Sequence, residues 1–234
     1  MPSDPPPESL PPSASPSPRA ESVPEPAVRR LSLYLRELEN LLDRNRETVS
    51  SRQLGESLGL TDAQVRKDLA YFGQFGHPGI GYRVDELVAR LRGILGTDKT
   101  WNVALVGAGH LGQALLSYRG FSRKGFQVVA VFDNDPAKVG RKMGVVAGLE
   151  VLPIERMPAV IAERDIQIGI LAVPAEVAQS VADAMVSAGV KGILNFAPTS
   201  LNVPARISLA TVDLAVHLEQ LAFRISDNLA VMER

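Results

Sequence analysis

Three stretches of this chain differ in the spacing of their hydrophobic residues. Between residues 28 and 96 apolar positions recur every three or four residues, as at Leu31, Leu35 and Leu38. This is the period of an amphipathic helix. After residue 100 the pattern changes to short continuous apolar runs with helical segments between them. Residues 1–26 follow neither period, so the pattern predicts three parts with different structures.

The middle stretch contains two sets of helix-start signals. Ser50 precedes Gln53 by three residues, and Thr61 precedes Gln64 by the same spacing. A Ser or Thr followed three residues later by Gln is typical of a capping box at a helix N-terminus. Gly59 lies between the two segments and predicts the turn. Two short capped helices joined by a tight turn indicate a helix-turn-helix.

Further elements complete this predicted N-terminal domain, which we expect over residues 27–97. The glycine-rich segment from Gly73 to Gly81 predicts a small hairpin, the wing of a winged helix. A helix is expected over residues 85–95, where leucine and valine recur at helical spacing. Residues 96–98 then read as a linker.

Residues 98–212 alternate between apolar runs and helical segments. The expected strands are 101–106, 126–132, 166–173 and 190–196, and the expected helices start at Gln113 and cover 153–164 and 175–188. Apolar strands that alternate with helices are typical of a doubly wound parallel sheet of the Rossmann type. From Asp213 on, leucine and isoleucine at helical spacing predict a final amphipathic helix.

Composition and charge refine this picture. Ten of the seventeen prolines lie in residues 1–26, which contain no aromatic residue, so we expect a disordered tail there. The net charge of the whole chain is −1, whereas residues 28–96 hold eleven basic and nine acidic side chains. An excess of two positive charges is small, so any nucleic-acid interpretation depends on residue pattern rather than bulk charge.

Several classes of protein are disfavoured by what the sequence lacks. There is no cysteine, which excludes disulfides, thiolate nucleophiles and cysteine-based metal sites, and the three histidines have no ligand spacing. No apolar run reaches the roughly 18 residues that a membrane span requires. No secretory signal is recognisable at the N-terminus. We therefore expect a cytoplasmic protein without a metal site or membrane contact.

A glycine motif follows the first predicted strand of the sheet. Gly107, Gly109 and Gly112 form a G-x-G-x-x-G motif that opens a helix, which is the context of a dinucleotide-binding turn. The pyrophosphate would lie at the helix N-terminus. Asp133 ends the next strand, about twenty residues later, where a carboxylate accepts bonds from a ribose 2′-hydroxyl and repels a 2′-phosphate. The pattern favours NAD over NADP.

Two other functions share this fold. In an NAD-dependent oxidoreductase Tyr118, near the end of the first helix, would be the best candidate acid. However, residues 197–234 leave no room for a substrate domain, and His110 reads as a polar position of the motif. A CoA-binding regulator would use a similar loop, although Asp133 counts against it.

The second helix of the predicted pair carries side chains suited to DNA. Its apolar stripe leaves four polar residues on other faces: Gln64, Arg66, Lys67 and Tyr71. Gln can read adenine, Arg can read guanine, and Lys and Tyr can hold phosphates. The wing adds His77, Tyr82 and Arg83. A single helix-turn-helix covers half a site, so DNA binding implies a two-fold dimer.

Over residues 27–232 the chain resembles the Rex family of redox-sensing transcriptional repressors. The motifs that carry the resemblance are RLSLYLR (30–36), QVRKDLAYFGQFG (64–76), GAGHLG (107–112), YRGF (118–121), FDNDPAKVG (132–140), AVPA (172–175), GILNFAP (192–198) and VDLA (212–215). The resemblance implies a non-enzymatic homodimer that binds an inverted-repeat operator when empty or bound to NAD⁺, and that NADH releases. It also implies that the last helix, residues 213–234, is swapped onto the partner.

The resemblance further implies particular residues. The cofactor would be held by Gly107, Ala108, Gly109, His110, Leu111, Gly112, Tyr118, Asp133, Asn134, Ala172, Val173, Pro174, Asn195, Phe196, Ala197 and Asp213, and the operator by Gln64, Arg66, Lys67, Tyr71 and Arg83. Arg36, Tyr118 and the partner subunit's Asp213 would couple the two sites. Leu214 is a departure, since some relatives have Phe there, facing the nicotinamide.

Overall fold

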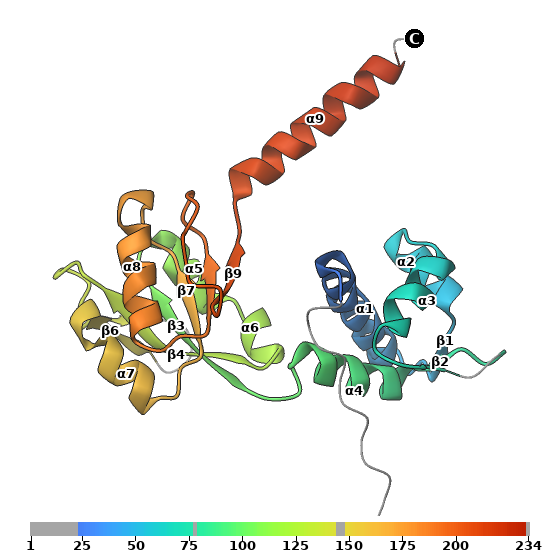
Figure 1. Cartoon of the computed structure of the whole chain (residues 1–234), viewed down its shortest axis with the longest axis horizontal. Coiled ribbons are helices and arrows are strands. Elements are labelled where there is room, and N and C mark those ends of the chain that lie inside the picture. The colour runs from blue at the N-terminus through green and yellow to red at the C-terminus, as the bar shows by residue number, and fades with distance from the viewer. Residues whose placement is uncertain (1–22, 77–78, 144–147, 233–234) are drawn as a thin grey trace, which may run out of the picture. The chain divides into compact units, whose positions relative to one another are not determined.

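A computed structural model describes residues 23–76, 79–143 and 148–232 (Figure 1). The chain divides into two compact units between Asp98 and Lys99. Each unit has its own hydrophobic core. The wing position His77 lies outside the described residues, as does most of the proline-rich segment that is expected to be disordered.

The first unit consists of helices with a very short sheet. Its helices are α1 (Glu25–Asp43), α2 (Ser51–Leu58), α3 (Asp62–Ala70) and α4 (Val84–Leu95), and its strands are β1 (Thr48–Val49) and β2 (Tyr82–Arg83). Leu31, Leu38 and Leu54 are fully buried, as the helical spacing of the leucines predicts. Helix α1 begins at Glu25, two residues inside the expected tail. Pro26 is tolerated there, because the first turn needs no backbone N–H from it.

The helix-turn-helix prediction is confirmed, with one local correction. Ser50 and Gln53 form a complete capping box at α2, and Gly59 ends that helix in the left-handed conformation. At α3 only half of the predicted box forms. The Thr61 side chain accepts from the Gln64 N–H at 3.1 Å, whereas the return bond from the Thr61 N–H to the Gln64 side chain is not formed. The Gln64 side chain, which would accept from the Thr61 N–H in a complete box, is instead turned toward Asp68 and donates to that carboxylate at 2.7 Å in a charge-assisted bond.

The wing differs from the hairpin that the glycines suggested. Strand β2 pairs antiparallel with β1, which precedes α2, so that Val49 lies opposite Tyr82. The described glycines between 73 and 81 all have positive φ, including Gly73 at 123° and Gly81 at 90°. A Cβ on Gly81 would lie 2.6 Å from the Val49 oxygen, so this glycine permits the pairing with β1.

The second unit contains a seven-stranded sheet in the order β5-β6-β4-β3-β7-β8-β9. The strands are β3 (Trp101–Val106), β4 (Phe126–Asp133), β5 (Lys142–Met143), β6 (Leu149–Pro153), β7 (Ile168–Leu171), β8 (Gly192–Asn195) and β9 (Ser208–Thr211). All neighbours are parallel except β5 against β6. The predicted doubly wound parallel sheet is therefore confirmed, although the sequence pattern missed β5, β6 and β9.

Helices cover both faces of this sheet. Ala104 and Val106 of β3 belong to the core formed with α7 (Met157–Glu163) and α8 (Ala175–Ser187). The alternate residues Val103 and Leu105 belong to the core beside α5 (His110–Ser117) and α6 (Gly120–Arg123). A short 3-10 turn, Ile154–Arg156, precedes α7. This alternation is what a central strand buried on both faces requires.

The last helix, α9 (Leu214–Met232), presents many apolar side chains to solvent within the single chain. The exposed fractions reach 66% at Leu218, 52% at Leu221 and 72% at Phe223. An apolar surface of this kind is typical of an interface with another chain. No helix in the described part of the chain is long and apolar enough to cross a membrane.

Candidate functional site

The glycine loop between β3 and α5 has the geometry that a dinucleotide requires. Gly107 has φ +103°, and a Cβ there would lie 2.2 Å from the Ala172 oxygen. A Cβ on Gly112 would lie 2.0 Å from the Gly107 oxygen. By contrast, a Cβ on Gly109 would meet nothing within 4 Å. The first and third glycines are therefore needed for packing, whereas the second leaves open space at the α5 N-terminus, where an anion is favoured.

Asp133, at the end of β4, is tied to this loop. Its carboxylate is nearly buried and accepts from Ala108 N–H at 2.7 Å, from Asp135 N–H at 2.9 Å and from Lys138 Nζ at 3.1 Å. Burial pushes the pKa of Asp133 up, but the bonds from Asp135, Ala108 and Lys138 outweigh it, so the pKa lies below its usual range. A ribose would meet a carboxylate that already has these partners, and the ribose contact stays a prediction.

The other expected cofactor residues follow the neighbouring parallel strands. His110 and Leu111 begin α5 and are exposed, and Asn134 is exposed after β4. The remaining positions form two loops, with Ala172, Val173 and Pro174 after β7 and Asn195, Phe196 and Ala197 at and after the end of β8. Because the strands are parallel, their carboxyl ends meet at one edge of the sheet. This edge is where ligands of such folds bind.

Within that edge, Asn195 has a structural task that sequence reasoning missed. Its side chain is fully buried, accepts from Ala197 N–H at 2.9 Å and donates to the Thr199 oxygen at 3.0 Å. The amide therefore shapes the loop after β8, and its contact with the cofactor stays a prediction.

The three residues of the expected coupling network lie in two units. Tyr118 ends α5 and is 61% exposed, with its ring 5.1 Å from that of Phe121 in an edge-to-face contact. Asp213 caps α9, where its Oδ1 accepts from the Ala215 N–H at 2.9 Å. Arg36 is exposed on α1 in the first unit. Contact among the three therefore stays a prediction, as does the effect of Leu214, which is 64% exposed.

The basic residues of α3, the expected recognition helix, are exposed. Arg66 donates to Asp62 at 2.7 Å and to the Ser51 hydroxyl, at the start of α2, at 3.2 Å. Lys67 is exposed, and Tyr71 is half-buried at the end of the helix. Exposed ion pairs are weak, so a DNA phosphate or base can replace the Asp62 partner of Arg66.

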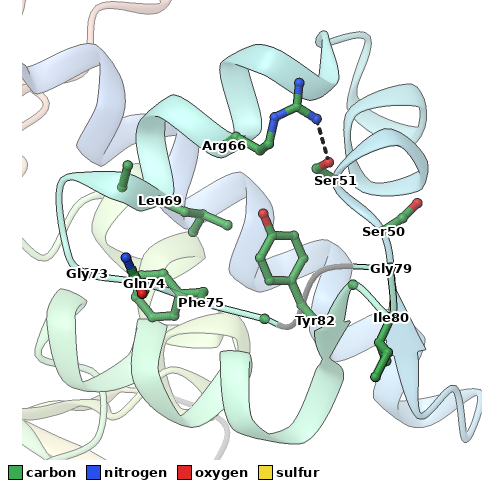
Figure 2. Close-up of a pocket in the computed structure, with 13 residues that line it drawn as sticks. Ser50, Ser51, Arg66, Leu69, Gly73, Gln74, Phe75, Gly79, Ile80 and Tyr82 are labelled. Atoms are coloured by element: carbon green, nitrogen blue, oxygen red, sulfur yellow. Dashed lines mark hydrogen bonds between the residues drawn. The ribbon is translucent and has the colours of Figure 1, made fainter.

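A cavity of about 660 Å³ separates α3 from the glycine-rich wing segment. Figure 2 shows Arg66 and Ser51 on one side of it, and Phe75, Ile80 and Tyr82 from the wing side. Next to the wing, Arg83 pairs with Asp85 at 2.9 Å. Arg83 is therefore a second exposed basic position of this unit, on β2.

Gln64 is the expected DNA residue whose surroundings differ most from expectation. Its Nε2 donates to Asp68 at 2.7 Å, so one of its two amide protons is already used. Asp68 is fully buried and was not among the expected functional residues. The remaining acceptor and proton of Gln64 stay its predicted means of reading a base.

The chain matches two protein families over separate ranges. Residues 22–70 match the family described as "Putative DNA-binding protein N-terminus", and residues 98–199 match "CoA binding domain". The two ranges correspond to the helix-turn-helix unit and to the sheet with the glycine loop.

Similar proteins and structures cover nearly the whole chain. A "Redox-sensing transcriptional repressor Rex" of Carboxydothermus hydrogenoformans is 54% identical over 87% of this chain and 96% of its own length. Another of the same description from Chloroflexus aurantiacus is 44% identical over 89% of this chain and 97% of its own length.

The solved structures give the same picture. A crystal structure of RSP with β-NAD⁺ and operator DNA has a TM-score of 0.84 and 41% identity over 90% of this chain and 96% of its own. A structure of RSP with β-NADH has a TM-score of 0.81 and 39% identity over 91% and 98%. With these identities across both units, the chain belongs to the Rex family of redox-sensing transcriptional repressors.

Proposed function

We propose that this chain represses transcription according to the NADH/NAD⁺ ratio. A homodimer binds an inverted-repeat operator when it is empty or holds NAD⁺, and NADH binding releases it. One observation carries the proposal: a capped helix-turn-helix and a glycine-loop site occur in one chain, and RSP, which was solved with both β-NAD⁺ and operator DNA, is 41% identical to it.

The nucleotide site supports NAD as the regulatory ligand. The pyrophosphate would lie over the open backbone at Gly109, with the loops after β4, β7 and β8 around the rest of the molecule. Although residues 98–199 match a CoA-binding family, the ionised Asp133 at the end of β4 favours a ribose with free hydroxyls. The same charge disfavours the 2′-phosphate of NADP.

The operator would be held by α3 and by β2. Arg66 and Gln64 are suited to base edges, and Lys67, Tyr71 and Arg83 are suited to phosphates. Since one recognition helix covers half of a site, two copies are needed. The apolar face of α9 is the surface on which we expect the second copy to pack, in a swapped arrangement.

Sensing requires a difference in free energy between the two nucleotides. NAD⁺ and NADH differ by one ring charge and one hydride, and only an interaction that depends on this difference can shift the dimer. A change from 1:99 to 99:1 needs about 5.5 kcal/mol of differential binding. A single hydrogen bond supplies too little, so we expect the two nucleotides of the dimer to act together. Tyr118 would exchange partners between Arg36 and the partner subunit's Asp213.

We further propose that the nucleotide is a ligand and not a substrate. Two relatives, 54% and 44% identical to this chain, are both described as transcriptional repressors, which supports a regulatory rather than a catalytic role for the nucleotide. Because the proposed target is chromosomal DNA, we expect the protein in the cytoplasm.

Fluorescence anisotropy of a labelled duplex tests the proposal. The duplex carries an inverted repeat of TTGTGA-type half-sites, the matched control duplex has the same bases scrambled, and salt is fixed because phosphate contacts depend strongly on it. We expect tight binding to the repeat alone, lost on addition of NADH and kept with NAD⁺. Binding to both duplexes alike, or binding indifferent to both nucleotides, contradicts the proposal and leaves an oxidoreductase or a CoA-binding regulator as the alternatives.

A further inference from the structure

A single buried carboxylate joins the recognition helix to the first helix of the unit. Asp68 of α3 is 1% exposed and accepts from Arg30 Nε at 2.5 Å and Nη2 at 2.7 Å, both on α1. Tyr34 Oη, also on α1, donates to it at 2.7 Å. Gln64 Nε2, one turn earlier on α3, donates at 2.7 Å.

This arrangement fixes the orientation of α3 in two ways. Arg30 binds both carboxylate oxygens in a planar fork, which restrains the side chain in direction as well as in distance. Arg30 and Tyr34 are four residues apart, so they lie on the same face of α1, and they meet Asp68 together. A rotation or a slide of α3 along α1 would break several bonds to a buried charge at once.

The electrostatics agree with a permanently ionised group. Burial pushes the pKa of Asp68 up, but the bonds from Arg30, Tyr34 and Gln64 outweigh it and hold the pKa below its usual range. The same contact raises the pKa of Arg30. Asp68 therefore stays charged at neutral pH.

The place of this carboxylate in the sequence points to a role in recognition. Asp68 directly follows Arg66 and Lys67, the basic residues that we expect to meet DNA. By charge alone a carboxylate there opposes the approach of phosphates. Its value to binding must therefore come from the geometry that it imposes on α3.

We propose that Asp68 is a positioning residue for operator recognition, which deepens the proposed function and rests on it. It holds α3 at a fixed angle on α1 and orients the Gln64 amide, so that the α3 side chains meet base edges in register. Arg36 lies on α1, six residues beyond Arg30. The hydrogen bonds of Arg30 and Tyr34 to Asp68 therefore also transmit a displacement of α1 to α3.

The test is the Asp68→Asn variant of the full chain, measured on the inverted-repeat duplex and on the scrambled duplex. We expect operator affinity to fall at least tenfold, while affinity for the scrambled duplex is unchanged or rises, because one negative charge is gone. NADH affinity, measured in the absence of DNA, should equal that of the wild type. A residue that only stabilised the fold would not separate the two duplexes in this way.

The matched control is Glu56→Gln, which removes the same charge from an exposed pair with Arg52 on α2. It should leave the ratio of the two affinities unchanged. The double variant Arg30→Gln with Asp68→Asn replaces the ion pair by two amides and no longer leaves a cation without its partner. We expect it to recover part of the operator affinity that Asp68→Asn loses.

Other results overturn the proposal. If Asp68→Asn is folded and keeps the wild-type ratio, or weakens both duplexes equally, Asp68 does not position α3 for recognition. If this variant does not fold, Tyr34→Phe is measured instead, because it removes only the hydroxyl that donates to Asp68 and keeps the buried ring. A smaller loss confined to the operator supports the proposal, and an unchanged ratio contradicts it. A wild-type protein without operator preference contradicts the proposed function instead.

Discussion

The Ala108 N–H donates to the Asp133 carboxylate at 2.7 Å, which ties the glycine loop after β3 to the end of β4. Asp133 thus has two tasks, one in the empty protein and one that we expect with nucleotide bound. The loop is held in shape before a ligand arrives. A preformed loop lowers the entropic cost of ordering the binding site.

The three glycines of the loop should differ in what they contribute. Gly107→Ala places a methyl group against the Ala172 oxygen at a positive φ, so we expect the free energy of unfolding to fall by about 1–3 kcal/mol. Gly109→Ala meets no neighbouring atom, so it should keep wild-type stability and weaken NADH binding. Urea unfolding and calorimetric titration measure the two effects. Equal stability of the two variants would show that the loop is not packed as described.

Acid should weaken the protein through Asp133. Its pKa is lower in the folded chain than the value of about 3.9 of an unfolded aspartate. The carboxylate therefore adds stability above that value, and the contribution is lost as the pH falls through the folded pKa. Asp133→Asn removes the contribution, so the gap in unfolding free energy between wild type and variant should be constant above about pH 5 and should narrow as the pH falls below that value toward the folded pKa. Urea unfolding of both proteins at a series of pH values measures this difference in free energy. A difference that does not change with pH would contradict an ionised, hydrogen-bonded Asp133.

Tyr118→Phe should separate nucleotide binding from DNA release. The side chain is largely exposed, so removal of its hydroxyl should leave stability and NADH affinity near wild type. If Tyr118 exchanges hydrogen-bond partners between the states, the variant should stay on the operator after NADH is added. Anisotropy with saturating NADH measures this. Wild-type release would exclude Tyr118 from the coupling.

Leu218→Asp should abolish the dimer. Leu218 is 66% exposed within the single chain, so the change costs the monomer little, whereas a charge buried in an apolar interface is strongly unfavourable. We expect monomers in sedimentation and loss of operator binding, with NADH affinity reduced only in so far as the partner's Asp213 contributes. Glu219→Lys, at the adjacent exposed position, is the control. A dimeric Leu218→Asp protein would place the interface elsewhere.

Features with local signals could be predicted from the sequence. The capping box at Ser50 and the turn at Gly59 depend on residues a few positions apart, and the glycine loop needs only the strand before it and the helix after it. The central strands were found because burial on both faces makes them continuously apolar. The short edge strands β5 and β9 carry little of this signal.

Features that depend on distant partners could not be predicted. The pairing of Val49 with Tyr82 joins residues on either side of the helix-turn-helix. Arg30 and Asp68 are 38 positions apart. The Gln64 side chain also bonds to this buried carboxylate instead of taking the capping role that its spacing indicated. Nothing in the linear pattern marks Asp68 as buried, because charged residues are usually exposed.

The reciprocal effect of operator on NADH binding tests the central claim most directly. Linkage requires the factor by which NADH weakens operator binding to equal the factor by which operator weakens NADH binding. We would titrate NADH into the protein with and without a saturating inverted-repeat duplex and follow the nucleotide's fluorescence. We predict a markedly weaker NADH affinity on the operator, by the same factor as in the anisotropy experiment, and little change for NAD⁺. Equal NADH affinities with and without the operator would contradict a redox-sensing repressor.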